Sequence, residues 1–287
     1  MKPIRVTMDS NVWERVVFPD RDSCPGSIPL LRMIKEAVQD GRVQGFICES
    51  TGTLEAIKKC ERPAYFANRK PKSSIQTERV GNNTSLTITF STDHTLHRGL
   101  HPKLIEKLQE ARAMGIRLLM VPCVGLPLPG QFLDDPTFYE PLAYSSGAYF
   151  QRFGDAAAAI EARRVGSALI AAIARRIEER FPATAQTSGA GMRLLVYAED
   201  EAERTEIAKA VAEWADGALV ASHIGIENDL LCTEDRGRSA GGPSIFDATN
   251  RAWLSATYGV KFTNIPELAA LLAGGLHIQP VAEREDP

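Results

Sequence analysis

The chain has 287 residues, of which 44% are hydrophobic and 24% are charged, and its formal net charge is −3. These values are typical of a soluble globular protein and exclude a general electrostatic attraction to nucleic acid or membranes. The five cysteines are odd in number and form no CxxC pair, which argues against a zinc site and a disulfide framework. Because the sequence has neither a secretory signal nor an apolar run long enough to cross a bilayer, we expect a cytoplasmic protein with no membrane partner.

Apolar and polar residues alternate over residues 4–8, which predicts a short strand. Asp9 follows where this strand should end, and Ser10 and Asn11 offer side chains that cap a turn or a helix start. Ligands of open α/β sheets bind at the carboxyl ends of the strands, so Asp9 is well sited for chemistry. A simple capping role for Asp9 is the alternative.

The next elements alternate between helix and strand. We predict a helix from Leu30 to Val38, an apolar strand over residues 43–48 and a helix over residues 53–60. Glu49 ends the second strand, and Glu55 lies on the predicted helix after it. This alternation predicts an α/β fold, a three-layer sandwich with a mainly parallel central sheet.

Residues 58–79 form a basic stretch that also contains Tyr65 and Phe66. Such a stretch suits a nucleic-acid strand, because cations contact phosphates and aromatic rings stack on bases. A solvated basic loop is the alternative. The cations that we predict to contact the substrate are Arg62, Arg69, Lys70 and Lys72.

The middle of the chain carries a second kind of element. Alternating polarity on both sides of residues 81–83 predicts a β-hairpin with strands at 74–80 and 84–92. Three histidines follow at helical spacing, but a glycine and a proline interrupt a helix there. We therefore expect surface or substrate-contacting histidines in preference to a metal site at His94, His97 and His101.

The pattern then returns to helices and strands. We predict a helix over 102–114, a strand over 116–121, a long helix over 149–181 and a linker over 183–191. Between the strand and the long helix, we predict that the Pro- and Gly-rich loop over 122–148 forms a lid or a substrate rim.

The final third resumes the α/β alternation. We predict strands over 192–197, 229–232 and 260–263. We predict helices over 201–213 and 253–258, a second helix that begins at Asp216, and a closing helix from Pro266 to Leu272. Asp216 opens a helix just before the strand at 229–232, and that strand ends in an acidic turn that contains Thr233 and Asp235.

Several of these acidic residues can converge at one edge of a right-handed α/β sheet. Clustered carboxylates disfavour one another's ionisation, and the usual solution is a hard divalent cation held by oxygen ligands. Bound Mg²⁺ or Mn²⁺ activates water and stabilises an in-line displacement at phosphorus. The candidates are Asp9, Glu49, Glu55, Asp216 and Asp235.

At this point the chain resembles the PIN-domain nucleases. The stretches that carry the resemblance are VTMDSNVW (6–13), GFICESTGTLEAIKK (45–59), ADGALVASHIGIENDLLCTEDRGR (215–238) and YGVKFTNIPELAALL (258–272). The resemblance implies that the metal ligands are Asp9, Glu55, Asp216 and Asp235, with Glu49 as a competing ligand. It also implies that Ser10, Asn11 and Thr233 support the ligands or contact the substrate.

The resemblance implies a PIN-like core over residues 1–60 and 191–280, an insertion over 61–190 and a short tail over 281–287. The activity that it implies is metal-dependent hydrolysis of RNA phosphodiester bonds. A cognate antitoxin or another protein partner, and a homo-oligomer, are compatible with it. The alternatives are a non-catalytic module that binds RNA or protein, and an enzyme that hydrolyses a small phosphate ester, although no Gly-rich phosphate loop follows any predicted strand.

Overall fold

A five-stranded sheet forms the centre of the computed structural model. Its strands are β1 (Ile4–Met8), β2 (Val43–Cys48), β5 (Arg117–Leu119), β6 (Leu230–Cys232) and β7 (Phe262–Thr263). They lie in the order β5-β2-β1-β6-β7, and every pair is parallel. The predicted α/β fold with a parallel central sheet is confirmed. The structure describes residues 2–67, 71–80, 83–92, 99–121, 128–139, 147–180, 195, 197–198, 200–237 and 243–274.

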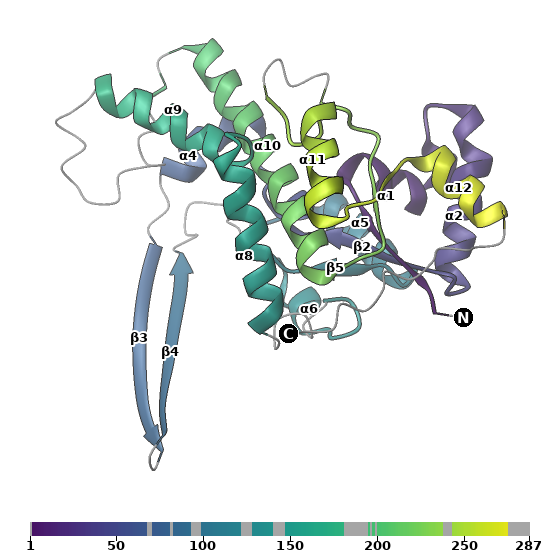
Figure 1. Ribbon diagram of the computed structural model, residues 1–287, viewed down its shortest axis with the longest axis horizontal. Helices are drawn as coiled ribbons and strands as arrows, with labels where there is room; N and C mark the ends of the chain where they lie inside the picture. The colour runs from purple at the N-terminus through teal and green to yellow at the C-terminus, as the bar shows by residue number, and fades with distance from the viewer. Residues whose placement is uncertain are drawn as a thin grey trace.

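Helices cover both faces of this sheet, which gives three layers (Figure 1). The helices α1 (Ser10–Val17), α2 (Ile28–Gln39), α5 (Pro102–Ala113) and α12 (Ile265–Ala273) pack on one face. The other face carries α8 (Gly147–Ala162), α10 (Glu201–Ile226) and α11 (Ala248–Tyr258). Because strand residues alternate between faces, Val6 and Met8 enter the first core while Thr7 meets His223 of α10.

The order of the strands has a consequence for the position of a site. The chain leaves the central β1 toward β2 and β5, and it later fills the opposite side with β6 and β7. The direction of winding therefore reverses between β1 and β6, whose ends are aligned by the pairing of Met8 with Cys232. In open α/β sheets the ligand crevice lies outside the carboxyl ends of strands at such a switch point.

Three predicted elements are wrong in the second half of the chain. Residues 201–226 form one helix, α10, so Asp216 lies within a helix and does not open one. The helix predicted over 149–181 is two helices, α8 and α9 (Ser167–Arg180), because Arg164 and Gly166 both have positive φ, 62° and 64°. The strand predicted over 192–197 is absent from the described residues there, Leu195 and Tyr197, which lie in helical turns.

The first half of the chain differs from the prediction at one important place. The helix after β2 is α3 (Glu49–Thr53), so the helix predicted over 53–60 is wrong and Glu55 lies in the turn that follows α3. A short 3-10 turn at Lys59–Glu61 and helix α4 (Arg62–Ala67) come next. Thr and Gly disfavour helix interiors. The helix nevertheless starts at Glu49, where the Ser50 hydroxyl donates to the Ala215 carbonyl oxygen of α10 and the Thr51 hydroxyl donates to the Cys48 carbonyl oxygen of β2.

The predicted hairpin is confirmed and is longer than predicted, with β3 at Pro71–Val80 and β4 at Asn83–Thr92. Figure 1 shows it extending away from the central sheet. The predicted loop over 122–148 contains helix α6 (Gly130–Leu133), and Tyr139 forms a bridge with Leu118 of β5. Because β5 itself falls within residues 61–190, the predicted boundary at residue 61 does not separate the core from an insertion.

The remaining short elements are two 3-10 turns, Pro19–Arg21 and Pro25–Ser27, in the predicted loop before α2. The tail over 281–287 lies outside the described residues. Among the helices that the structure does describe, none combines the length and the apolar composition needed to cross a membrane.

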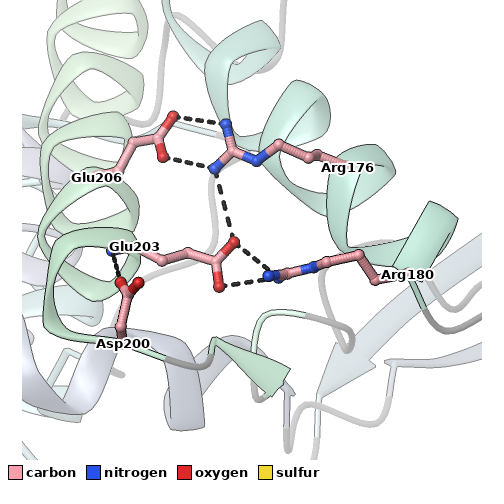
Figure 2. Close-up of polar contacts among 5 residues, drawn as sticks. All are labelled: Arg176, Arg180, Asp200, Glu203 and Glu206. Carbon is pink, nitrogen blue, oxygen red and sulfur yellow. Dashed lines mark hydrogen bonds and ion pairs between the residues drawn. The ribbon is translucent and has the colours of Figure 1, made fainter.

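Ion pairs from Arg176 and Arg180 of α9 to Glu203 and Glu206 join α9 to the first turns of α10 (Figure 2). Arg180 contacts both carboxylate oxygens of Glu203 at 2.8 and 2.9 Å, and Arg176 contacts both oxygens of Glu206 at 3.1 and 2.5 Å. Glu203 is buried, and its backbone N–H donates to the N-cap Asp200. Because α10 carries Asp216 about three turns beyond Glu206, these pairs help to hold that helix in place.

We predict that Glu203→Ala destabilises the protein by about 2 kcal/mol, because it removes a buried carboxylate that accepts from Arg180 and also pairs with Arg176. The exposed Glu206 pair contributes little, so Glu206→Ala should cost less than ~1 kcal/mol. Urea denaturation of the two variants at the same pH measures the difference. Equal losses for both would contradict the role of burial at Glu203.

Candidate active site

Asp9 is the centre of the candidate site. It follows β1 directly, caps the N-terminus of α1 and is 2% exposed. Its oxygen Oδ1 accepts a hydrogen bond from the Ser10 backbone N–H at 2.6 Å, and Oδ2 accepts from Asn11 Nδ2 at 2.7 Å and Thr233 Oγ1 at 2.6 Å. Asp9 thus does cap the helix, as the alternative prediction held, and the same bonds present a buried carboxylate at the switch point.

The donors to Asp9 are themselves fixed by the loop after β6. Thr233 accepts from the Asp235 backbone N–H at 3.0 Å, so its own hydroxyl hydrogen is free to go to Asp9. The side-chain oxygen of Asn11 accepts from the Glu234 backbone N–H at 3.1 Å, which directs its amide hydrogens to Asp9. Thr233 is 2% exposed. Asn11 and Thr233 therefore support Asp9, which leaves their predicted contacts with substrate without support from this geometry.

Asp235 is held at the rim of the same loop. Its Oδ1 accepts from the Gly237 backbone N–H at 2.7 Å, and its carbonyl oxygen accepts from Arg251. Gly237 has φ +67°, and a Cβ there would lie 2.7 Å from the Asp247 backbone nitrogen. Only glycine fits this turn. Asp235 is partly buried, and its charge is one of the factors that raise the pKa of Asp9, after burial.

Asp216 approaches from the middle of α10. Burial raises its pKa well above the usual range, and repulsion from Asp9, Glu55, Glu213 and Asp235 adds to this effect. The structure therefore brings Asp216 within electrostatic reach of all the other predicted acids of this cluster. Helix α10 reaches this point because His223, two turns later, bonds to Thr7 of β1.

Glu55 joins the cluster from the turn after α3. Burial and the charge of Asp9 raise the pKa of Glu55 to about 7, while a hydrogen bond with Ser10 and the charge of Arg62 act in the opposite direction. The position of Glu55 off the predicted helix does not separate it from Asp9, because the turn folds back against α10.

Arg62 is the reason that this turn folds back, and its predicted role is wrong. It is 4% exposed, and its guanidinium donates to the carbonyl oxygens of Ile57, Glu55 and Ala208 at 3.1, 3.2 and 2.5 Å. It connects the Glu55 turn to α10 and is not available to a phosphate. Tyr65 is 1% exposed, so it is not available to stack on a base either.

Glu49 lies outside the cluster. Its Oε2 accepts from the Val121 backbone N–H at 3.2 Å and from the Tyr139 hydroxyl at 3.1 Å. Burial raises the pKa of Glu49 to about 7, and no other acid contributes to that shift. Between the two glutamates that the sequence left as alternatives, the structure brings Glu55, and not Glu49, to Asp9.

Glu213 is an acid of the site that the sequence did not indicate. Glu213 is buried, and its side chain accepts from the Ile245 backbone N–H at 3.2 Å. Burial raises the pKa of Glu213, and Asp235 and Asp247 add to the effect. Glu213 lies three residues before Asp216 on one helix, and the i,i+3 spacing would have placed both on one face had α10 been predicted as continuous.

The remaining residues that we predicted to contact substrate are basic residues and histidines. Arg69, Lys70, His94 and His97 lie outside the described residues, and for Lys72 only its place in β3 is described. His101 caps α5 by accepting from the Lys103 backbone N–H. It has a structural role at a helix start.

The acids of the cluster suit a hard divalent ion in their chemistry, since all their donor atoms are carboxylate oxygens. Over the described part of the chain, however, no three His, Cys, Asp or Glu side chains are gathered closely enough to hold an ion directly. Mg²⁺ commonly takes one or two carboxylates and completes its shell with water, which fits this arrangement. On Asp9, Oδ1 has a weaker second partner than Oδ2, the Ser10 hydroxyl at 3.4 Å.

Comparisons of the chain with protein-family models, with curated proteins and with solved structures found no match. The resemblance to PIN-domain nucleases therefore stays a prediction.

We predict that Glu55 lowers stability as pH rises from about 4.5 to about 7. Its folded pKa is raised, so the folded state binds more protons than the unfolded state in this window, and stability is lost as pH rises. Glu55→Gln should remove this part of the slope. His223 acts in the opposite direction, because burial lowers its pKa to about 3. The comparison is therefore between variants, by urea denaturation at pH 5 and pH 7.5.

Glu49→Gln is the matched control, because burial raises the pKa of Glu49 to the same value, about 7, without another acid. Both variants should flatten the slope, but in an Asp9→Asn background the effect of Glu55→Gln should shrink while that of Glu49→Gln persists. If Glu55→Gln changed the slope equally with Asp and with Asn at position 9, the charge of Asp9 would not be acting on Glu55.

We also predict that Thr233→Val destabilises the protein by about 1–3 kcal/mol at pH 7, because it removes a donor to a buried carboxylate. The cost should shrink as pH falls through the pKa of Asp9, which burial raises. Thr233→Ser keeps the hydroxyl and should cost only the lost methyl group, about 1 kcal/mol. Denaturant titrations of both variants at two pH values measure this, and a pH-independent cost for Thr233→Val would contradict it.

Proposed function

We propose that this protein is a divalent-metal-dependent ribonuclease of the PIN-like type. The observation that carries the proposal is the environment of Asp216, whose ionisation is opposed by Asp9, Glu55, Glu213 and Asp235 together. Acids from β1, the α3 turn, α10 and the loop after β6 meet at the switch point of a parallel sheet. So much like charge is stable only if protons or a cation neutralise it.

The residues that would hold Mg²⁺ or Mn²⁺ are Asp9, Glu55, Asp216 and Asp235, directly or through water. When bound, such an ion activates water and neutralises charge that develops on phosphate oxygens. The chain's own contribution is orientation: Ser10, Asn11 and Thr233 fix the Asp9 carboxylate, and Arg62 fixes the turn of Glu55. Glu213, bonded to the Ile245 backbone, adds charge from behind Asp216.

An RNA strand needs positive charge near this acidic site. Arg236 is exposed, is adjacent to Asp235, and after burial is the next cause that lowers the pKa of Arg251. It is therefore a cation at the rim of the site, and we propose that it contacts phosphate. Arg69, Lys70 and Lys72 remain in the proposal as further contacts, whereas Arg62 does not.

The test measures cleavage of single-stranded RNA in Mg²⁺ or Mn²⁺, with chelator as a blank. We expect Asp9→Asn and Asp216→Asn to lower the rate about 10²-fold or more. Glu49→Gln is the matched control for a buried glutamate outside the cluster, and it should cleave like the parent chain. Activity in chelator, or equal losses for Glu49→Gln and Glu55→Gln, would contradict the proposal.

Metal binding has a readout that does not need activity. At a concentration of Mn²⁺ 100 times its Kd, the ion should stabilise the protein by about 2.7 kcal/mol. Asp216→Asn should raise stability without metal, because it relieves repulsion, and should abolish most of the gain from Mn²⁺. A variant that loses the Mn²⁺ gain and keeps its cleavage rate would point to a non-metal mechanism.

A further inference from the structure

Among the residues that the structure describes, β3 and β4 pair only with each other and form a two-stranded sheet. Each strand has ten residues, and the register runs from Val80 opposite Asn83 to Pro71 opposite Thr92. Figure 1 shows the two strands extending away from the body of the protein. A two-stranded hairpin is marginal in water, and three or more strands with a hydrophobic face are needed for independent stability. The hairpin is therefore a candidate for joining further strands.

The two outer edges of this hairpin differ in sequence. Strand β3 contains Pro71, Lys72, Glu78 and Arg79, which are the residue types that block pairing at sheet edges. Strand β4, NTSLTITFST, contains no charge, no proline and no glycine, and it is rich in Thr. These are strand-forming residues with no protection against pairing. No described strand pairs with the outer edge of β4, so β4 has the edge that is suited to further pairing.

The register also determines which backbone groups of β4 face outward. Two residues separate the closing pair, Val80 and Asn83, and such a pair is hydrogen-bonded in both directions. Hydrogen-bonded and non-hydrogen-bonded pairs then alternate, so the backbone groups of Leu86, Ile88 and Phe90 point away from β3. The same three residues share one face of the ribbon with Ile75, the cross-strand partner of Ile88.

We propose that β4 pairs antiparallel with β4 of a second copy of this chain, with Ile88 opposite Ile88 on the two-fold axis. This register joins outward-facing backbone groups to each other. It places Leu86 opposite Phe90 on one face, and Ser85 opposite Ser91 and Thr87 opposite Thr89 on the other. Aliphatic–aromatic and hydroxyl–hydroxyl pairs of this kind stabilise antiparallel sheets.

A second copy suits this edge because an isologous contact sets the strand against itself. A neutral strand tolerates that arrangement, whereas charged residues opposite like charges would oppose it. The result is a four-stranded sheet in which each copy contributes Leu86, Ile88 and Phe90, together with the polar Thr84 and Thr92 of the same strand, to one face. Four strands are more stable in water than a single two-stranded hairpin. Ten residues span about 34 Å, so the two bodies lie at opposite ends of the joined sheet.

The test uses sedimentation of the full chain over a range of concentrations. Ile88→Lys places like charges directly opposite each other on the axis and should weaken the dimer at least ~10-fold. Ile75→Lys is the matched control, because the same change lies at the same level of the ribbon on the other strand. It should leave the dimer largely intact. Equal weakening by both variants, or a monomeric parent chain at every concentration, would overturn the proposal.

Two further measurements separate a lost contact from a lost hairpin. A mixture of Ile88→Lys and Ile88→Glu chains should dimerise although neither does so alone, because the opposite charges meet on the axis. In the parent chain, the backbone amides of Leu86, Ile88 and Phe90 should exchange more slowly as concentration rises, and those of Ile75 and Thr77 should not. A mixture that stays monomeric, or exchange that is independent of concentration, would overturn the pairing. A partner strand from another protein would give that second result.

Discussion

The burial of the Asp9 carboxylate is the constraint on which the site depends. A buried carboxylate is stable only when donors replace the water it has lost, and here they come from Ser10, Asn11 and Thr233. Two of these donors are oriented in turn by backbone groups of residues 234 and 235. One side chain therefore ties the end of β1 to the start of α1 and to the loop after β6. The pairing of β1 with β6 and the hydrogen bonds of Asp9 are parts of one arrangement.

That arrangement accumulates negative charge instead of dispersing it. The charges of Glu55, Asp216 and Asp235 interact with that of Asp9, and the pKa values of Asp9, Glu55 and Asp216 are all raised. A fold selected for stability alone has no reason to direct four acids to one strand edge. Glu49 makes the contrast clear: it is just as buried, but two donors satisfy it and no other acid acts on it. Burial alone accounts for the raised pKa of Glu49, whereas repulsion between acids adds to the raised pKa of Asp216.

The arginines of the protein serve this arrangement from inside. Arg62 holds the Glu55 turn against α10, and Arg251 holds the loop of Asp235 by donating to carbonyl oxygens of Asp235 and Phe246. Arg180 fixes the start of α10 through Glu203. These guanidinium groups bond to the protein itself, so the proposed function requires other cations for contact with phosphate. Local charge density in a sequence cannot distinguish the two uses, because it records neither the burial of an arginine nor its acceptors, which for Arg62 and Arg251 are backbone carbonyl oxygens.

Local pattern in the sequence determined the elements whose signals are short-range. The alternation over residues 4–8, the spacing of Leu31, Ile34 and Val38, and the capped helix after Asn264 all formed as expected, because local sterics and one apolar face decide them. The sequence also indicated Asp9, Asp216 and Asp235 as a group. Tertiary structure decided the rest. It continued α10 through Asp216, chose Glu55 over Glu49, added Glu213, and turned Arg62 inward. Each of these outcomes depends on the packing of residues 49–62 against α10, more than a hundred positions away, and no local pattern records a contact at that distance.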